Sequence, residues 1–376
     1  MAGLRYPSHG RSRQTGRPIR PSAEGRSSWL NFLRKILSFS IPNRFIPAHP
    51  DTFFKPDGHE CPSYICCDHM PHDHMPHDDI TNPDDDTEDE PIGGERFAWA
   101  RRNIMLTIAY DGTNYRGWQV QPNGMSVQEC VENAVEQLTG DRQRVYCAGR
   151  TDAGVHALGQ AANFPTNSSI PIANIRRGLQ SFLPNDIVVV SAKEVSKSFH
   201  ATYSAIHKRY RYVIHDGDVC PPFLKHYVHR SLNQLDVDRM AEAANFLLGT
   251  HDFRCFEKHF PNKSTSIRTI MDVSVQRLSC WLPWTSPHDW VPIQDRRHDQ
   301  PEMPLIVFEV MADGFLYNMV RAIVGTLMEI GLGKQTPDSL SEVIRSMDRA
   351  KAGMTALPNG LYLVSVEYPE ALCENL

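Results

Sequence analysis

The residues best placed for chemistry lie in a loop with a glycine on each side of a single carboxylate. The loop runs Cys147-Ala148-Gly149-Arg150-Thr151-Asp152-Ala153-Gly154-Val155-His156-Ala157. Glycines permit unusual backbone angles and allow a large ligand to approach the main chain. Arg150 offers a planar donor fork that suits a phosphate or a base edge. On these residues alone, Asp152 is either a functional carboxylate beside a cation or an Asx turn that bonds its own backbone.

A second segment combines cations with aromatic rings, in the order Lys208-Arg209-Tyr210-Arg211-Tyr212. The alternation of a strand predicts Tyr210 and Tyr212 on one face and the three cations elsewhere. Such a segment fits a nucleic-acid surface, although both tyrosines fit a protein core equally well. The sequence lacks the glycine-rich motifs of nucleoside triphosphate and dinucleotide loops, which disfavours those ligands.

A third candidate site lies in the first hundred residues. His69-Met70-Pro71-His72-Asp73 is repeated at once as His74-Met75-Pro76-His77-Asp78, near Cys61, Cys66 and Cys67. Tracts rich in His and Cys can bind metal. However, the spacing matches no pair of C-x-x-C motifs, and an acidic run from Asp84 to Glu90 follows. We therefore expect a disordered acidic linker here, with metal binding as the alternative.

Two similar series of strands and helices must position these residues. In the first, strands are expected at 104–110, 145–148, 160–164 and 187–192, and helices from Ser126 to Gly140 and over 172–183. In the second, strands are expected at 209–215, 269–278, 304–312 and 361–368, and helices at 235–248, 319–331 and, after Thr336, 337–349. The repetition predicts an α+β protein with two duplicated halves around a largely antiparallel sheet. Residues 279–303, which contain three tryptophans, are expected to form a hairpin insertion.

Charge is distributed unevenly along the 376 residues, whose net charge is −5. Residues 1–50 hold nine Arg or Lys and one Glu, whereas residues 51–95 hold one Lys and fourteen Asp or Glu. The remainder is neutral, which excludes a uniformly basic nucleic-acid coat but allows a local basic cleft. No run of 18 apolar residues exists, so no membrane span is expected. The scattered cysteines indicate a reducing compartment.

Residues 1–100 have the composition of a low-complexity, disordered extension. Within it, Trp29 to Leu37 forms a basic amphipathic segment typical of an organellar transit peptide. We expect the protein in the cytoplasm, with an organelle as the alternative if residues 1–50 act as a targeting segment.

The loop that begins at Gly149, GRTDAGVHALGQ, closely resembles the catalytic loop of the tRNA pseudouridine synthase A (TruA) family. Further blocks resemble that family in the same order along the chain: AYDGTNYRGWQVQ at 109–121, SVQECVENA at 126–134, FHATYSAIHKRYRYVI at 199–214, LLGTHDFRCF at 247–256, SIRT at 266–269, FLYNMVRAIVG at 315–325 and GLYLVSVEYP at 360–369. The resemblance covers 103–370 and none of the first hundred residues.

The resemblance implies a pseudouridine synthase fold of two ferredoxin-like halves, at 101–200 and 201–370. It also implies an isomerase that converts uridine to pseudouridine at positions 38, 39 and 40 of the tRNA anticodon stem-loop. The reaction gains and loses no atoms, so no cofactor or metal is expected. The partners implied are tRNA and a second copy of the chain in a homodimer.

The family's site residues carry over to matching positions here. They imply that Asp152 is the nucleophile, Arg321 its ion-pair partner and Tyr210 the ring that stacks on the bound base. Arg150 would assist base flipping or bind phosphate, and Lys208, Arg209 and Arg211 would bind the RNA. Whether Asp152 attacks C6 of the base or C1′ of the ribose stays open. The family commonly has Arg where this chain has Thr202. This difference either removes an RNA contact or is offset by Lys208 or Arg209. An RNA-binding module without turnover is the alternative function.

Overall fold

The computed structural model describes residues 97–258, 265–278 and 304–373. Residues 1–96 of the expected disordered extension, with the His/Cys-rich repeat, and the hairpin insertion lie outside these ranges. The last four residues of that extension, 97–100, are described, and Phe97 and Ala100 are buried. The elements of the first half are β1 (Arg102–Tyr110), α2 (Val127–Thr139), β2 (Tyr146–Cys147), β3 (His156–Thr166), α3 (Ile172–Phe182) and β4 (Ile187–Val195). The elements of the second half are β5 (His207–His215), β6 (His229–Arg230), α4 (Val237–Ala244), β7 (Gly249–Asp252), β8 (Ile267–Arg277), β9 (Leu305–Ala312), α5 (Met319–Gly331), α6 (Ser339–Ser346), β10 (Leu361–Glu367) and α7 (Glu370–Cys373).

One sheet runs through both halves in the order β4-β1-β3-β10-β5-β9-β8-β7, with β2 paired to β3 and β6 to β5. Within the first half, the strands lie side by side in the order β4-β1-β3-β2. If the strands are numbered by their sequence within the half, this order is 4-1-3-2. The second half repeats this order with β10-β5-β9-β8, so the chain contains the same βαββαβ arrangement twice. These are the predicted duplicated ferredoxin-like halves of an α+β protein.

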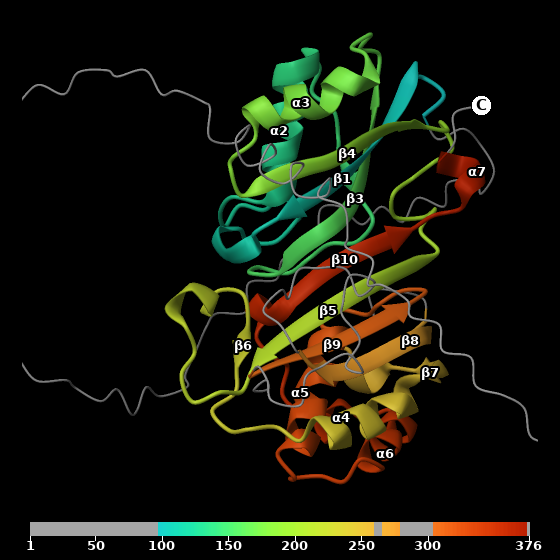
Figure 1. Ribbon diagram of the computed structural model, residues 1–376. Helices are drawn as coiled ribbons and strands as arrows, with labels where there is room; N and C mark the ends of the chain where they lie inside the picture. The colour runs from blue at the N-terminus through green and yellow to red at the C-terminus, as the bar shows by residue number, and fades with distance from the viewer. Residues whose placement is uncertain (1–96, 259–264, 279–303, 374–376) are drawn as a thin grey trace, which may run out of the picture. The chain divides into compact units, whose positions relative to one another are not determined.

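The halves meet where β3 pairs with β10, and this pairing is parallel, whereas the long strands within each half pair antiparallel. Figure 1 shows α2 and α3 beside the strands of the first half and α4, α5 and α6 beside those of the second. The described residues form one compact unit, because the shared sheet joins the halves. The domain boundary predicted at residue 200 falls between β4 and β5 and stays a prediction.

Local signals account for the ends of α2 and for the burial patterns of β1 and α5. The Ser126 side chain accepts a hydrogen bond from the Glu129 N–H, and Gly140 ends α2 in the left-handed conformation, as the sequence predicts. The apolar residues Ile104, Leu106 and Ile108 alternate along β1 and are fully buried. Helix α5 spans the predicted residues, and ten of its thirteen residues are buried.

Several predicted elements differ from the structure in their ends, and three of these differences have a clear position or cause. The helix predicted over 235–248 ends at Ala244, because residues 245–247 tighten into a 3-10 turn before β7. The helix predicted after Thr336 starts at Ser339, and Thr336 contributes its carbonyl oxygen rather than a side-chain cap. Strand β3 begins at His156, four residues earlier than predicted. The strands β6 and β7 are too short to show an alternating pattern, and the sequence did not predict them.

Candidate active site

Asp152 lies in the loop between β2 and β3, and Arg321 lies in the first turn of α5, from the other half of the chain. The Arg321 Nη1 atom donates to Asp152 Oδ2 at 2.8 Å. Nη1 also donates to Asn318 Oδ1 at 2.7 Å, and Nε donates to the Ala356 carbonyl at 2.8 Å. Asp152 keeps 28% of its side chain exposed, and Arg321 keeps 16%. The carboxylate is therefore held by an oriented cation and is still open to a ligand.

Side chains hold three consecutive carbonyl groups where the loop begins. Thr202 Oγ1 donates to Cys147 O at 2.6 Å, Lys208 Nζ donates to Ala148 O at 2.6 Å, and Gln160 Nε2 donates to Gly149 O at 2.7 Å. Gln160 is fully buried, so breaking its bond would leave a buried polar group unsatisfied. The backbone that leads to Arg150 and Asp152 is thus anchored from β3, from β5 and from the segment before β5.

The turn after β1 lies along the other side of the loop. The Trp118 N–H donates to the Thr151 carbonyl at 3.0 Å, and Tyr110 shares a 2.7 Å hydrogen bond with Thr151 Oγ1. Gly117 has a φ of +94°, and a Cβ there would meet the Thr151 carbonyl oxygen. Only glycine combines this backbone conformation with so close an approach. The turn therefore fixes the backbone immediately before Asp152.

Tyr210 lies on β5 with 7% of its surface exposed, and its ring meets Phe315 edge to face at a centroid distance of 5.0 Å. Burial, with a smaller contribution from the Asp152 charge, raises the pKa of the Tyr210 hydroxyl above its ordinary value. The hydroxyl is therefore neutral in the physiological range. Tyr212 is fully buried and donates to the Leu357 carbonyl, so it is a core residue.

The four predicted RNA-binding cations have different surroundings. Arg150 is exposed, and among the described residues no hydrogen bond or ion pair involves its side chain. Lys208 lies on the same face of β5 as Tyr210, because residues two apart on a strand point the same way. The prediction that all three cations lie away from the tyrosine face was therefore wrong for Lys208. Arg209 and Arg211 lie on the opposite face, where Arg209 pairs with Asp272 at 2.7 Å and Arg211 pairs with Glu309 at 2.6 Å. Arg211 is fully buried, so RNA cannot reach it in this conformation.

Sequence reasoning missed the part that two residues play in shaping the site. Asn318 has a φ of +61°, which asparagine tolerates better than most residues, and it orients Arg321. Gln160 acts through a main-chain carbonyl 11 residues earlier, so nothing in its own neighbourhood indicates its role. Thr202 was noted only as a departure from the family's Arg, and the structure shows that it holds the Cys147 carbonyl. Among the described residues, no group of three His, Cys, Asp or Glu is arranged to hold a metal ion. No helix of the described part of the chain has the length and apolar character needed to cross a membrane.

Comparison with known proteins supports the family resemblance of the sequence. Residues 106–204 and 243–369 match the family model of the tRNA pseudouridine synthases. The tRNA pseudouridine synthase A of Acetivibrio thermocellus is 45% identical over 267 residues, which is 71% of this chain and all of the relative. The corresponding enzyme of a Thermoanaerobacter species and the tRNA pseudouridine synthase A 2 of Clostridium perfringens are each 43% identical over the same lengths. The resemblance seen in the sequence is confirmed, and the chain belongs to the tRNA pseudouridine synthase family, whose members are isomerases that act on uridines in tRNA.

Proposed function

We propose that this protein converts uridine to pseudouridine at positions 38, 39 and 40 of the tRNA anticodon stem-loop, with Asp152 as the nucleophile. The observation that carries this proposal is the 2.8 Å pair between Arg321 and a partly exposed Asp152, in a loop anchored on both sides. The Arg321 guanidinium faces the carboxylate oxygen that would attack and fixes its orientation by a hydrogen bond. The target positions come from the family resemblance.

The proposed reaction breaks the N1–C1′ bond, turns the uracil and joins C5 to C1′. The C5 proton leaves and N1 gains a proton, so the base keeps its composition. Asp152 forms a temporary bond to C6 or to C1′, and Arg321 holds the carboxylate oxygen in line throughout. This chemistry requires no electron transfer and no added group, so we propose no cofactor.

A stacked base must leave its helix before Asp152 can reach it, at a cost of a few kcal/mol. Arg150 is suited to fill the vacated place or to hold a phosphate, because its guanidinium is exposed two residues from the nucleophile. Tyr210 is suited to stack on the extruded uracil, which can contribute about 1–3 kcal/mol. Lys208 supports the loop that carries Arg150 and Asp152.

We also propose that the protein acts as a homodimer in the cytoplasm, since a tRNA extends beyond one monomer face. The organellar alternative depends on residues 1–50, which lie outside the described residues. Sedimentation of the full-length protein with and without tRNA tests the dimer, and microscopy of the tagged full-length chain tests the location.

Tritium release from tRNA that carries 5-tritiated uridine tests the proposed function. We expect release with multiple turnovers and, after mapping of the product, pseudouridine at positions 38, 39 and 40. Tight tRNA binding without release would instead support the alternative of an RNA-binding module. Release from uridines outside the anticodon stem-loop would contradict the proposed positions.

We predict that tRNA binding weakens steeply with salt and that Arg150 accounts for part of the slope. Each phosphate contact contributes about 0.7–0.9 to the slope of log affinity against log salt. Arg150→Gln should therefore reduce the slope by about that amount, if Arg150 contacts a phosphate. The matched control is Arg345→Gln on α6, which removes another exposed arginine. A slope that is flat in the parent protein, or lowered equally by both variants, would contradict the prediction.

A further inference from the structure

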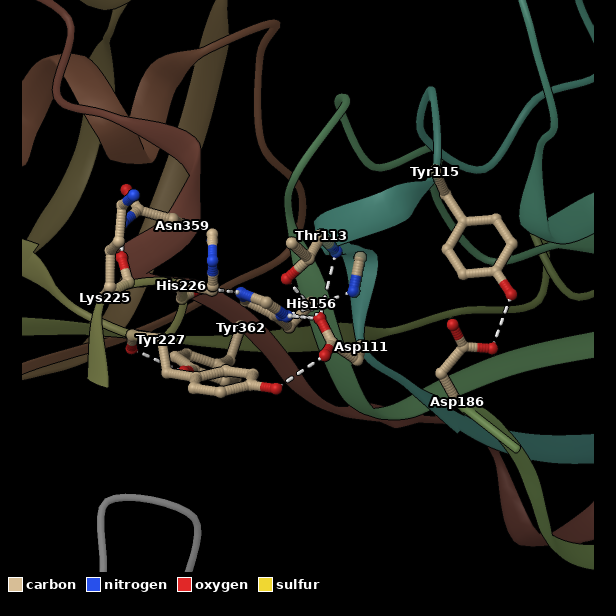
Figure 2. Close-up of polar contacts among 11 residues, drawn as sticks. Asp111, Thr113, Tyr115, His156, Asp186, Lys225, His226, Tyr227, Asn359 and Tyr362 are labelled. Carbon is tan, nitrogen blue, oxygen red and sulfur yellow. Dashed lines mark hydrogen bonds and ion pairs between the residues drawn. The ribbon is translucent and has the colours of Figure 1, made fainter. Parts of the chain in front are cut away.

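His156 ends the catalytic loop four residues after Asp152 and is the first residue of β3. Its side chain is only 2% exposed, yet it is surrounded by polar groups from separate parts of the chain. Figure 2 shows the ring between the Asp111 carboxylate and the main chain at His226, with the rings of Tyr227 and Tyr362 beside it. The proposed chemistry does not use this buried histidine.

The hydrogen bonds of the ring identify its neutral tautomer. His156 Nε2 lies 2.9 Å from the His226 carbonyl oxygen, which can only accept, so Nε2 carries the proton. The Gly112 N–H donates to Nδ1 at 3.1 Å, so Nδ1 is the acceptor. Asp111 Oδ1 also lies 3.2 Å from Nδ1 and would pair with it if that nitrogen gained a proton.

Aromatic rings of the second half hold the imidazole from its sides. Tyr362 of β10 stacks on it at a centroid distance of 4.8 Å and an interplanar angle of 22°, and Tyr227 lies at 5.5 Å. Tyr227 donates its hydroxyl proton to Asp111 Oδ2 at 2.7 Å, and Tyr362 donates to the Tyr227 carbonyl at 2.6 Å. The cluster therefore connects the two halves next to the catalytic loop.

The link from the imidazole to Asp152 runs through Gly112. A Cβ added at Gly112 would overlap the Val155 carbonyl group, so the Gly112 backbone lies directly against the loop. Val155 in turn donates its N–H to the Asp152 carbonyl at 3.1 Å. A shift of Gly112 away from Nδ1 would therefore change its packing against Val155, which bonds the backbone of the nucleophile.

We propose that His156 is a positioning residue that, in its neutral form, holds Gly112 against the loop and fixes Asp152 for attack, and that protonation of Nδ1 releases this contact. A protonated Nδ1 carries its own hydrogen and can no longer accept the Gly112 N–H. It would instead donate that hydrogen to the Asp111 carboxylate. The inference rests on the proposed function, because it concerns the placement of the proposed nucleophile.

The surroundings place this protonation on the acid side of neutrality. Burial lowers the pKa of His156 below its ordinary value of 6.5, and the Asp111 charge only partly offsets this. Burial alone would raise the pKa of Asp111, but hydrogen bonds from Thr113 and Tyr227 lower it. The pKa values of Tyr227 and Tyr362 are raised, so their hydroxyls stay neutral. Of the groups that face the ring, His156 therefore changes charge first as the pH falls below 6.5.

The sign of the pH effect follows from these directions. The unfolded chain binds a proton at His156 near pH 6.5, whereas the folded protein resists it to lower pH. This linkage carries no penalty above pH 6.5, and stability falls as the pH drops from there toward the folded pKa. The turnover number should fall over the lower part of this range, as His156 gains its proton in the folded enzyme.

Two substitutions of similar size test the proposal in the full-length enzyme. His156→Asn can offer its Oδ1 to the Gly112 N–H, whereas His156→Leu offers no acceptor. We expect His156→Leu to lower kcat about 10²-fold with an unchanged KM and tRNA affinity, the loss that a displacement of about 1 Å can cause. His156→Asn should recover a large part of kcat. Because asparagine does not titrate, the fall of kcat at acid pH that we attribute to His156 should be absent from the pH profile of this variant.

His215→Asn is the matched control. His215 is also 2% exposed, and its Nδ1 accepts the Gly217 N–H at 3.3 Å, but it lies at the end of β5. The His215→Asn substitution should lower the melting temperature without changing kcat. All kcat values are measured at a temperature below the melting points of all variants. Equal effects of His156→Leu and His156→Asn, or a kcat for His156→Leu like that of His215→Asn, would overturn the proposal.

Tyr227→Phe provides a test with little risk to folding. It keeps the ring beside His156 but removes the donor to Asp111, so the Asp111 charge attracts a proton at His156 more strongly. The acid limb of kcat should move to higher pH, and an unmoved limb would contradict the proposal. Asp152→Asn is measured in the same series. If it is active, the proposed nucleophile fails and this inference with it; if it is inactive while His156→Leu keeps full kcat, only this inference fails.

Discussion

Replacing Asp152 with asparagine is expected to reduce isomerisation to background while the protein stays folded. The amide has the size of the carboxylate, and its oxygen can still accept the hydrogen bond from Arg321 that now measures 2.8 Å. The main-chain bond from Val155 to the Asp152 carbonyl is unaffected. An amide, however, cannot act as an anionic nucleophile. Binding of tRNA should persist or tighten, because removal of a negative charge near a polyanion relieves repulsion.

Asp152→Glu extends this test by keeping the charge and moving it. The added methylene shifts the carboxylate by about 1 Å, and misplacement on that scale can cost on the order of 10²-fold in rate. The measurement combines single-turnover tritium release, a melting curve and a tRNA-binding isotherm on the same preparation. A structural Asp152 would tolerate asparagine, and any loss of activity would follow unfolding. An active Asp152→Asn enzyme would therefore exclude the proposed nucleophile.

Arg321→Met is expected to lower the single-turnover rate by about 10²–10³-fold, the loss typical of removing one preorganised donor. The guanidinium holds Asp152, Asn318 and the Ala356 carbonyl at once, and methionine keeps only its volume. Arg321→Lys should also be impaired, because one ammonium group cannot reproduce the planar set of donors. Stability should fall by about 1–3 kcal/mol, since partly buried acceptors lose their partner.

Arg277→Met is the matched control for Arg321. Arg277 forms a two-bond ion pair with Asp216 at 2.8 Å, and its side chain is 13% exposed, close to the 16% of Arg321. This variant should lose stability and keep its rate at a temperature below its melting point. The double variant Asp152→Asn/Arg321→Met should be no slower than Asp152→Asn alone, because residues that act as a unit are not additive. Equal rate losses for Arg321→Met and Arg277→Met would show that Arg321 only supports folding.

Local patterns were enough to predict the elements that contain the site. The Ser126 cap, the terminal Gly140 and the apolar residues of α5 act within a few residues of one another, and the structure confirms each of them. The repeated order of strands and helices likewise predicted the duplicated halves, and one continuous core joins them. The predictions that were wrong concern the ends of α4 and α6, the start of β3 and the face of Lys208. Local turns end α4 and start α6. The short strands β6 and β7 were not predicted, because they form by pairing with β5 and β8.

The sequence by itself determined the residue types of the loop, the strand and helix that present Tyr210 and Arg321, and the family to which they belong. Only the tertiary structure decided which of these side chains meet. Arg321 reaches Asp152 across 169 positions of the chain, whereas Arg211 turns away from the loop and is buried against Glu309, 98 positions distant. The cations of β5 look alike in sequence, but each one's role depends on the group opposite it, a carbonyl for Lys208 and carboxylates for Arg209 and Arg211. Alternation along the strand sets the face, whereas pairing between distant segments sets the group opposite, and no local propensity records that pairing.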